Sequence, residues 1–162
     1  MRWLVDGYNV IRGDPELAQH EAQGLEDGRA ALLRLIAGAA RASGDPFTVV
    51  FDGARRAGGV ATGGQVQVVF SRPPETADDV LRRLAVELRS GAAVVSSDRA
   101  VRDAAERAGA AAVTAEQFLA ALETVADEER EDDERSRRGG NPRRPSRAER
   151  AARRVLGRLR PR

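Results

Sequence analysis

The chain of 162 residues has no cysteine and a single histidine. The lack of cysteine excludes disulfides, thiolate zinc sites and a cysteine nucleophile. A Ser-His-Asp triad would need His20, which lies in a polar stretch, and no nucleophile elbow accompanies it. No apolar run approaches the ~20 residues of a membrane span, and no basic segment precedes an apolar one at the N-terminus. These absences favour a cytoplasmic protein with no membrane partner.

Aromatic residues are also scarce, at 4% of the chain, so alanine, valine and leucine must fill the core. Lysine is absent: all 27 basic residues are arginine, a side chain suited to phosphate recognition. Charge is distributed unevenly, because residues 127–134 carry a net −6, residues 135–162 a net +11, and the rest a net −3. The sequence therefore predicts a mildly acidic body and a strongly basic tail, and basic tails often contact nucleic acid.

Apolar runs alternate with helical patterns, as in a parallel α/β protein. The expected strands cover residues 3–5, 47–51, 66–70, 92–96 and 110–113. The expected helices cover residues 28–42, 76–90, 99–108 and 114–124, and Asp14-Pro15-Glu16 has the chemistry of a helix start or a turn. With right-handed crossovers, these elements predict a small, mostly parallel sheet of about five strands with helices on both faces.

The alternating pattern ends near residue 125. Residues 1–125 are therefore the expected folded domain, and residues 126–162 are an expected charged C-terminal extension. Within it, residues 146–159 are suited to a short basic helix that carries Val155, Leu156 and Leu159. Because this apolar stripe is thin, we expect an arm that orders on binding rather than a second core.

Acidic residues follow the apolar runs. Asp6 ends the first run, Asp52 ends the second, Asp78 and Asp79 begin the helix after the third, and Asp98 follows the fourth. Ligands of open parallel sheets bind outside the carboxyl ends of the strands. Carboxylates that meet there repel one another, and a hard divalent cation such as Mg²⁺ or Mn²⁺ relieves that repulsion. The pattern predicts a cation site suited to phosphodiester hydrolysis.

Each acid also has a purely structural interpretation. Asp52 precedes a glycine, a combination that is common in turns, and Asp98 is suited to cap a helix. Thr76 and Asp79 have the spacing of a capping box, which gives Asp79 a local role and leaves Asp78 to face the cleft. The joint pattern therefore carries more weight than any single acid.

The residues around these acids have open roles as well. Gly7 is expected to let the backbone turn at the end of the first strand, and Tyr8 either packs on the sheet edge or stacks on a base. Asn9 is close enough to the first acid to hold a water or to ligate through its amide oxygen. Arg55 and Arg56, in a glycine-rich loop, either contact phosphates or are simply solvated.

Four motifs stand in order along the chain: Asp6-Gly7-Tyr8-Asn9-Val10-Ile11, Phe51-Asp52-Gly53, Glu75-Thr76-Ala77-Asp78-Asp79 and Ser96-Ser97-Asp98-Arg99. Together they resemble the NYN domains of the YacP-like family, which are PIN-like endoribonucleases of bacteria. The likeness covers about residues 1–125. It implies a three-layer PIN-like α/β fold, metal-dependent cleavage of mRNA or rRNA, and association with ribosomes.

The resemblance also implies roles for individual residues. Asp6, Asp78 and Asp98 would bind Mg²⁺ or Mn²⁺ and serve in catalysis, with Asn9 as support and with Asp52 and Asp79 as secondary metal-ligand candidates. The candidate RNA contacts are Tyr8, Arg55, Arg56, Arg99, Arg143 and Arg144.

Three classes of function are compatible with this pattern. The leading hypothesis is a metal-dependent endoribonuclease in which water attacks the phosphorus and leaves a 5′-phosphate and a 3′-hydroxyl. The competing class is a non-catalytic RNA- or ribosome-binding module on the same fold. A phosphatase is disfavoured, because an Asp-x-Asp nucleophile pair would need an acid two residues after Asp6, where the sequence has Tyr8.

Overall fold

The computed structural model describes residues 1–53, 64–131 and 154–159 of the chain. Five strands make one sheet: β1 (Arg2–Asp6), β2 (Phe47–Phe51), β3 (Val66–Phe70), β4 (Ala92–Val95) and β5 (Ala111–Val113). Six α-helices accompany them in the described ranges: α1 (Gly7–Gly13), α2 (Pro15–Gln23), α3 (Leu25–Ser43), α4 (Ala77–Leu88), α5 (Arg99–Arg107) and α6 (Ala115–Glu131). Two 3₁₀ turns, η1 (Arg89–Gly91) and η2 (Gly157–Leu159), complete the described elements. None of the described helices is long and apolar enough to cross a membrane.

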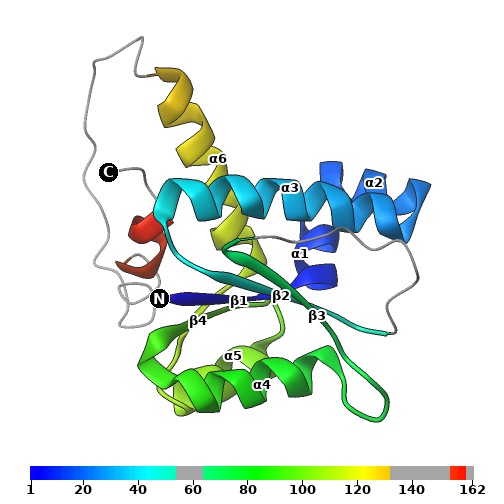
Figure 1. Cartoon of the computed structure of the whole chain (residues 1–162), viewed down its shortest axis with the longest axis vertical. Coiled ribbons are helices and arrows are strands. Elements are labelled where there is room, and N and C mark those ends of the chain that lie inside the picture. Colours follow the sequence, from blue (N-terminus) through cyan, green and yellow to red (C-terminus); the bar gives the residue numbers. More distant parts are fainter. Residues whose placement is uncertain (54–63, 132–153, 160–162) are drawn as a thin grey trace.

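All strand pairs are parallel, and the order across the sheet is β3-β2-β1-β4-β5 (Figure 1). The central strand β1 therefore lies between β2, which follows it in the chain, and β4, to which the chain returns from the far edge. The strand order reverses at this point, which opens a crevice outside the carboxyl ends of β1 and β4. The predicted α/β fold with about five parallel strands is confirmed.

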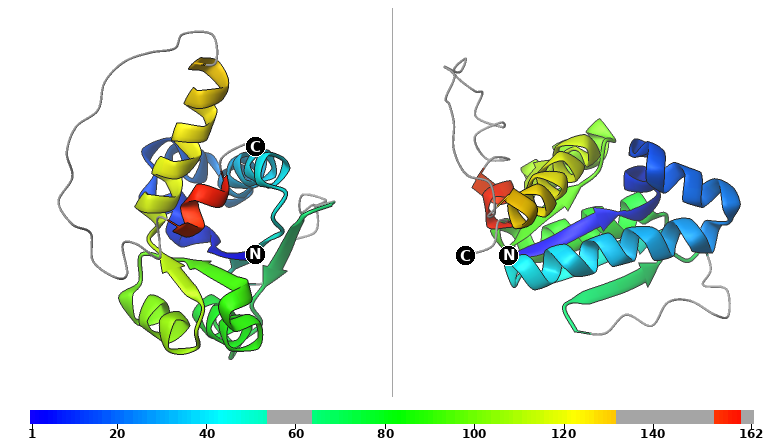
Figure 2. Two further views of the ribbon diagram at one scale, coloured as in Figure 1. Left: turned by 90° about the vertical axis from the view of Figure 1, so that its left-hand side faces the viewer. Right: turned by 90° about the horizontal axis from the view of Figure 1, so that it is seen from above.

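Helices cover both faces of the sheet and make three layers (Figures 1 and 2). Alternation along β1 supplies both cores, because Trp3 and Val5 face one side and Leu4 faces the other. The first core includes residues of α1, α2, α3 and α6, and the second includes residues of α4 and α5. The sheet is thus fixed from both sides, and its carboxyl edge has a defined geometry.

The structure corrects the sequence prediction in one important place. Asp6 is followed directly by the helix α1, whereas the sequence suggested only a turn at Gly7. Asp6 caps this helix by accepting a hydrogen bond from the Asn9 backbone N–H (3.3 Å). Gly7 does not have a left-handed backbone; instead, a Cβ atom there would lie 2.2 Å from Cε1 of Phe51. The glycine is needed for close packing and not for a turn.

Other differences concern the ends of elements. Helix α3 begins three residues before the expected position 28, α6 continues to Glu131, and β4 ends one residue early at Val95. The start that the sequence indicated at Asp14-Pro15 is confirmed, since Asp14 caps α2 and Pro15 is its first residue. The ends of helices and strands carry weak sequence signals, which explains the small shifts at α3 and β4.

The described end of the tail, residues 154–159, packs against the body. Val155 is 5% exposed and belongs to the first core, and Arg158 forms a two-point ion pair with Asp45 (2.9 and 3.0 Å). A buried carboxylate of the body thus meets a cation from the tail. That the tail orders on binding stays a prediction. The domain boundary at residue 125 stays a prediction.

Replacing Asp45 by asparagine is expected to lower the free energy of unfolding by about 2 kcal/mol at neutral pH, since the buried carboxylate that pairs with the half-exposed Arg158 would lose its charge. Asp45 is 4% exposed and also accepts hydrogen bonds from the Met1 ammonium and the Trp3 indole. Burial opposes ionisation here, but these bonds and Arg158 outweigh it and hold the pKa of Asp45 below its ordinary value. The charge of Asp45 therefore stabilises the fold at pH values above the ordinary aspartate pKa. This stability is lost as the pH falls through the lowered pKa.

Urea unfolding at pH 7 measures this loss. Asp103→Asn is the matched control, because Asp103 lies on the surface in an exposed ion pair with Arg99 and should change the unfolding free energy by less than about 0.5 kcal/mol. Equal stability of Asp45→Asn and wild type would contradict the interpretation.

Candidate active site

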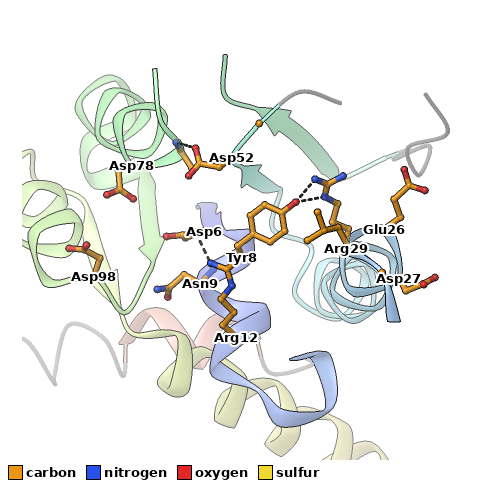
Figure 3. Close-up of a pocket in the computed structure, with 14 residues that line it drawn as sticks. Asp6, Tyr8, Asn9, Arg12, Glu26, Asp27, Arg29, Asp52, Asp78 and Asp98 are labelled. Atoms are coloured by element: carbon orange, nitrogen blue, oxygen red, sulfur yellow. Dashed lines mark hydrogen bonds between the residues drawn. The ribbon is translucent and has the colours of Figure 1, made fainter. Parts of the chain in front are cut away.

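A pocket of about 920 Å³ opens at the carboxyl edge of the sheet, at the reversal of strand order. Its size is in the range of small-molecule and cofactor sites. The pocket is lined by residues from β1 and α1, the start of α3, the end of β2, the start of α4 and the turn before α5; the polar lining residues are Asp6, Tyr8, Asn9, Arg12, Glu26, Asp27, Arg29, Asp52, Asp78 and Asp98 (Figure 3).

Asp6 lies deepest among the acids, at the end of β1, and is 8% exposed. Its Oδ1 accepts the N–H of Asn9 and its Oδ2 accepts the hydroxyl of Ser96 (3.1 Å). Burial raises the pKa of Asp6 to about 6; the two hydrogen bonds lower it, and the charges of Asp78 and Asp52 raise it further. The carboxylate is thus held in place although its charge is poorly solvated.

The turn between β4 and α5 delivers Asp98 to the same pocket. The buried Ser96 hydroxyl accepts the N–H of Asp98 (3.2 Å) while donating to Asp6, so one side chain connects the two acids. Asn9 Oδ1 accepts the N–H of Ser97 (2.6 Å) and ties helix α1 to this turn. Asp98 itself caps α5 through the N–H groups of Ala100 and Val101. The structural role that the sequence allowed for Asp98 is confirmed, and the residue lines the pocket as well.

Helix α4 carries Asp78 to the same pocket. Asp52 fixes the start of this helix, because its Oδ1 accepts the Ala77 N–H (2.7 Å) and the Ser71 hydroxyl (2.8 Å). Burial raises the pKa of Asp78, Arg82 opposes the rise, and the charges of Asp98 and Asp52 add to it. Asp78 therefore senses the negative charge of its neighbours across the pocket.

Asp79 lies outside the pocket lining. It forms the predicted capping box with Thr76, since each residue accepts a hydrogen bond from the backbone N–H of the other (3.1 and 3.2 Å). The hydrogen bonds from Thr76 lower the pKa of Asp79, and Arg82 lies 3.4 Å away. The capping argument that separated Asp78 from Asp79 thus agrees with where the two side chains lie.

The other predicted residues fall into three groups. Tyr8 lines the pocket and packs edge-on against Phe51 (5.1 Å between ring centroids), so it lies on the sheet edge as well as in the cleft. Arg99 is exposed, pairs with Asp103 and is absent from the pocket lining. The remaining candidates lie outside the described residues: Arg55, Arg56, Arg143 and Arg144.

Sequence reasoning missed Ser96, Arg12 and Arg29. Ser96 had a signal, because it stands two residues before Asp98 at the end of an apolar run. Arg12 lies on the helix that was not predicted, and Arg29 lies on α3, which reaches the pocket only through the fold.

The chemistry of the donors fits a hard divalent cation, since carboxylate and amide oxygens face one pocket and the pKa of both Asp6 and Asp78 is raised by burial and by neighbouring carboxylates. In the described part of the chain, however, no three acidic or histidine side chains lie close enough together to form a ligand cluster as they stand. Direct coordination of one ion by Asp6, Asp78 and Asp98 together would therefore require these side chains to move closer to one another; Asp78 is partly exposed and Asp98 is exposed.

The acid-lined pocket at the switch point of the parallel sheet agrees with a nuclease-type α/β fold, the class to which the matching family belongs. The chain belongs to the family of YacP-like NYN domains. The family match covers residues 3–160, and so extends beyond the likeness of residues 1–125 that the sequence motifs indicated.

One curated protein and two crystal structures support this assignment. The chain is 34% identical over 128 residues to a Bacillus subtilis (strain 168) protein described as "uncharacterized protein YacP", and the match covers 75% of each chain. A crystal structure of Rae1 (YacP) from Bacillus subtilis aligns with a TM-score of 0.70 and 30% identity over 82% of this chain and 79% of that one. A point mutant of Rae1 aligns with a TM-score of 0.66 and 25% identity over 99% of this chain and 93% of that one.

Proposed function

We propose that this protein is a metal-dependent endoribonuclease that hydrolyses RNA phosphodiester bonds with Mg²⁺ or Mn²⁺. The observation that carries the proposal is the convergence of Asp6, Asp52, Asp78 and Asp98 on one pocket at the carboxyl edge of the sheet. Each of these carboxylates arrives on a separate element, so their meeting depends on the whole fold and not on any one turn or helix cap. Membership of a nuclease-type family supports the same conclusion.

The residues divide into those that would hold the cation and those that place them. Asp6, Asp78 and Asp98 are the proposed ligands, and a bound divalent cation would activate the attacking water and stabilise charge on the phosphate. Asp52 fixes the start of α4 beneath Asp78, and Asn9 fixes the turn that carries Asp98. Because water attacks rather than the ribose 2′-hydroxyl, the products carry a 5′-phosphate and a 3′-hydroxyl.

RNA is the proposed partner, as mRNA or rRNA, and association with ribosomes and a cytoplasmic location are part of the proposal. The sequence of residues 135–162 has a net charge of +11. Such a segment adds sequence-independent affinity for a phosphate backbone, and that affinity falls steeply with salt.

Cleavage of labelled single-stranded RNA is expected with Mg²⁺ or Mn²⁺ and not with EDTA. End-group analysis should show 5′-phosphate products, and DNA of the same sequence serves as the comparison substrate. If wild-type protein binds RNA but cleaves it with neither metal, the alternative of a non-catalytic RNA- or ribosome-binding module replaces this proposal.

A further inference from the structure

Arg29 lies at the end of the pocket away from Asp78 and Asp98, beside Tyr8 (Figure 3). Its guanidinium lies on three aromatic rings. The guanidinium carbon of Arg29 is 5.3 Å from the ring centroid of Tyr8, 5.5 Å from that of Phe51 and 5.2 Å from that of Phe70. The phenol oxygen of Tyr8 accepts hydrogen bonds from Nε (2.8 Å) and Nη2 of Arg29. We call these four residues the Arg29 cluster. The aromatic rings fix the guanidinium without neutralising it.

The charge of Arg29 is not paired with a carboxylate in the described part of the chain. Its hydrogen-bond acceptor there, the Tyr8 phenol, is neutral. By contrast, Arg12 on the pocket rim has an ion pair with Glu21 (3.4 Å). A guanidinium has five N–H donors in a rigid fork, and Tyr8 takes two of those on Arg29. Donors are therefore left for an anion in the pocket.

The position of the cluster relates it to the acids. Tyr8 follows Asp6 by two residues, and its ring lies between Asp6 and Arg29 (Figure 3). One pocket thus has Asp6, Asp78 and Asp98 toward one end and the fixed Arg29, with no ion pair in the described residues, toward the other. A phosphodiester chain suits both ends, because its phosphates repeat. One phosphate would lie at the proposed metal site and another would be within reach of Arg29. This inference rests on the proposed function. It implies that the RNA strand runs across the pocket from the acids to Arg29.

We propose that Arg29 binds one backbone phosphate of single-stranded RNA, adjacent to the phosphate that is cleaved, and that Tyr8 holds its guanidinium in position for this contact. Glu26 and Asp27 line the same end of the pocket and offset its positive charge. The contact is therefore made through the directional fork of one arginine and not through a broad positive potential. Such forked contacts to phosphate are short and strong.

The test measures binding of a fluorescent single-stranded RNA by anisotropy in EDTA, so that cleavage does not intervene. Arg29→Gln is expected to weaken binding about tenfold and to lower the slope of log affinity against log salt by about 0.7, the value for one phosphate contact on a single strand. Arg34→Gln is the matched control, because it removes an exposed arginine from the same helix away from this pocket. It should leave the affinity nearly unchanged.

A second measurement locates the phosphate. RNAs that each carry one neutral methylphosphonate linkage should lose affinity for wild-type protein at one position near the cleaved bond. Arg29→Gln should be insensitive to that same substitution, because the contact is already absent. Arg29→Lys keeps the charge without the fork and should recover only part of the affinity. If Arg29→Gln does not fold, the comparison of wild type with Arg29→Lys across the methylphosphonate series decides the question.

The outcomes separate this inference from the proposed function. Unchanged affinity in folded Arg29→Gln, or equal sensitivity of both proteins to every methylphosphonate position, would overturn the phosphate contact even if wild type cleaves RNA. Weakened binding with the coupled loss at one position supports the contact even if no cleavage is detected with either metal. In that second case the endoribonuclease proposal fails and the RNA subsite stands.

Discussion

Replacing Asp6 by asparagine is expected to lower the rate of metal-dependent RNA cleavage about a thousandfold, a loss of ~4 kcal/mol of transition-state stabilisation. RNA binding should stay intact or become tighter, because the substitution removes a negative charge from the pocket that is proposed to receive phosphates. The change is isosteric, so asparagine can keep the hydrogen bond from the Asn9 N–H that starts helix α1. Single-turnover cleavage with Mg²⁺ or Mn²⁺, alongside anisotropy of RNA binding in EDTA, measures both expectations.

The same variant should be more stable than wild type at neutral pH. Because burial raises the pKa of Asp6 from 3.8 to about 6, the ionised carboxylate destabilises the native state. The folded protein binds the proton more tightly than the unfolded chain, so this part of the stability is present at low pH and is lost as pH rises through about 6. The amide of Asp6→Asn does not titrate, so the advantage of this variant should grow between about pH 4 and pH 6 and reach about 1–3 kcal/mol above pH 7.

Loss of cleavage together with a stability gain distinguishes a functional acid from a structural one. A structural acid would show the reverse, with lower stability and activity reduced only in proportion to the unfolded fraction. Asp78→Asn and Asp79→Asn form a sharper pair at neighbouring positions. Asp78 lines the pocket and Asp79 closes a capping box outside it, so only the first substitution should abolish cleavage. Asp79→Asn should lower stability only slightly, because Thr76 remains as the N-cap of α4.

The strands and the acids that follow them could be predicted from sequence because their signals are local. A buried parallel strand is a short apolar run. The residue that follows it lies at the carboxyl edge of the sheet, and this position does not depend on the rest of the chain. Asp6, Asp52 and Asp98 were found in this way. The separation of Asp78 from Asp79 came from another local rule, the spacing of a capping box. Metal binding by these acids stays a prediction.

The features that were missed depend on contacts between distant segments. The residue Arg29 has no sequence neighbour that marks it, and its role arises only where α3 brings it onto Phe51 and Phe70 from two other strands. Helix α1 was missed because seven residues with glycine at each end have low helix propensity. Its formation depends on the cap from Asp6 and on burial of Val10 and Ile11 in the core.

Gly7→Ala is expected to lower the free energy of unfolding by about 3 kcal/mol or more, the upper range for overpacking a rigid site. The added Cβ would lie 2.2 Å from Cε1 and 2.5 Å from Cδ1 of Phe51. Phe51 is fully buried and its ring packs on Phe70 (5.8 Å between centroids) and Tyr8 (5.1 Å). The ring cannot move away without disturbing the Arg29 cluster. Urea unfolding measures the loss, which for a chain of this size corresponds to a melting temperature about 6–12 °C lower.

Gly13→Ala provides the matched control at the other end of the same helix. A Cβ at Gly13 would meet only the Ala115 Cβ at 3.5 Å and the Leu119 Cδ1 at 4.0 Å, both ordinary contacts, so stability should change by less than about 1 kcal/mol. The double variant Gly7→Ala, Phe51→Leu should recover part of the loss, because the smaller side chain makes room for the methyl group. Wild-type stability in Gly7→Ala would show that Phe51 relocates freely. Because Gly7 lies between Asp6 and Tyr8, the packing that requires a glycine also sets the positions of the deepest acid and of the ring that holds Arg29.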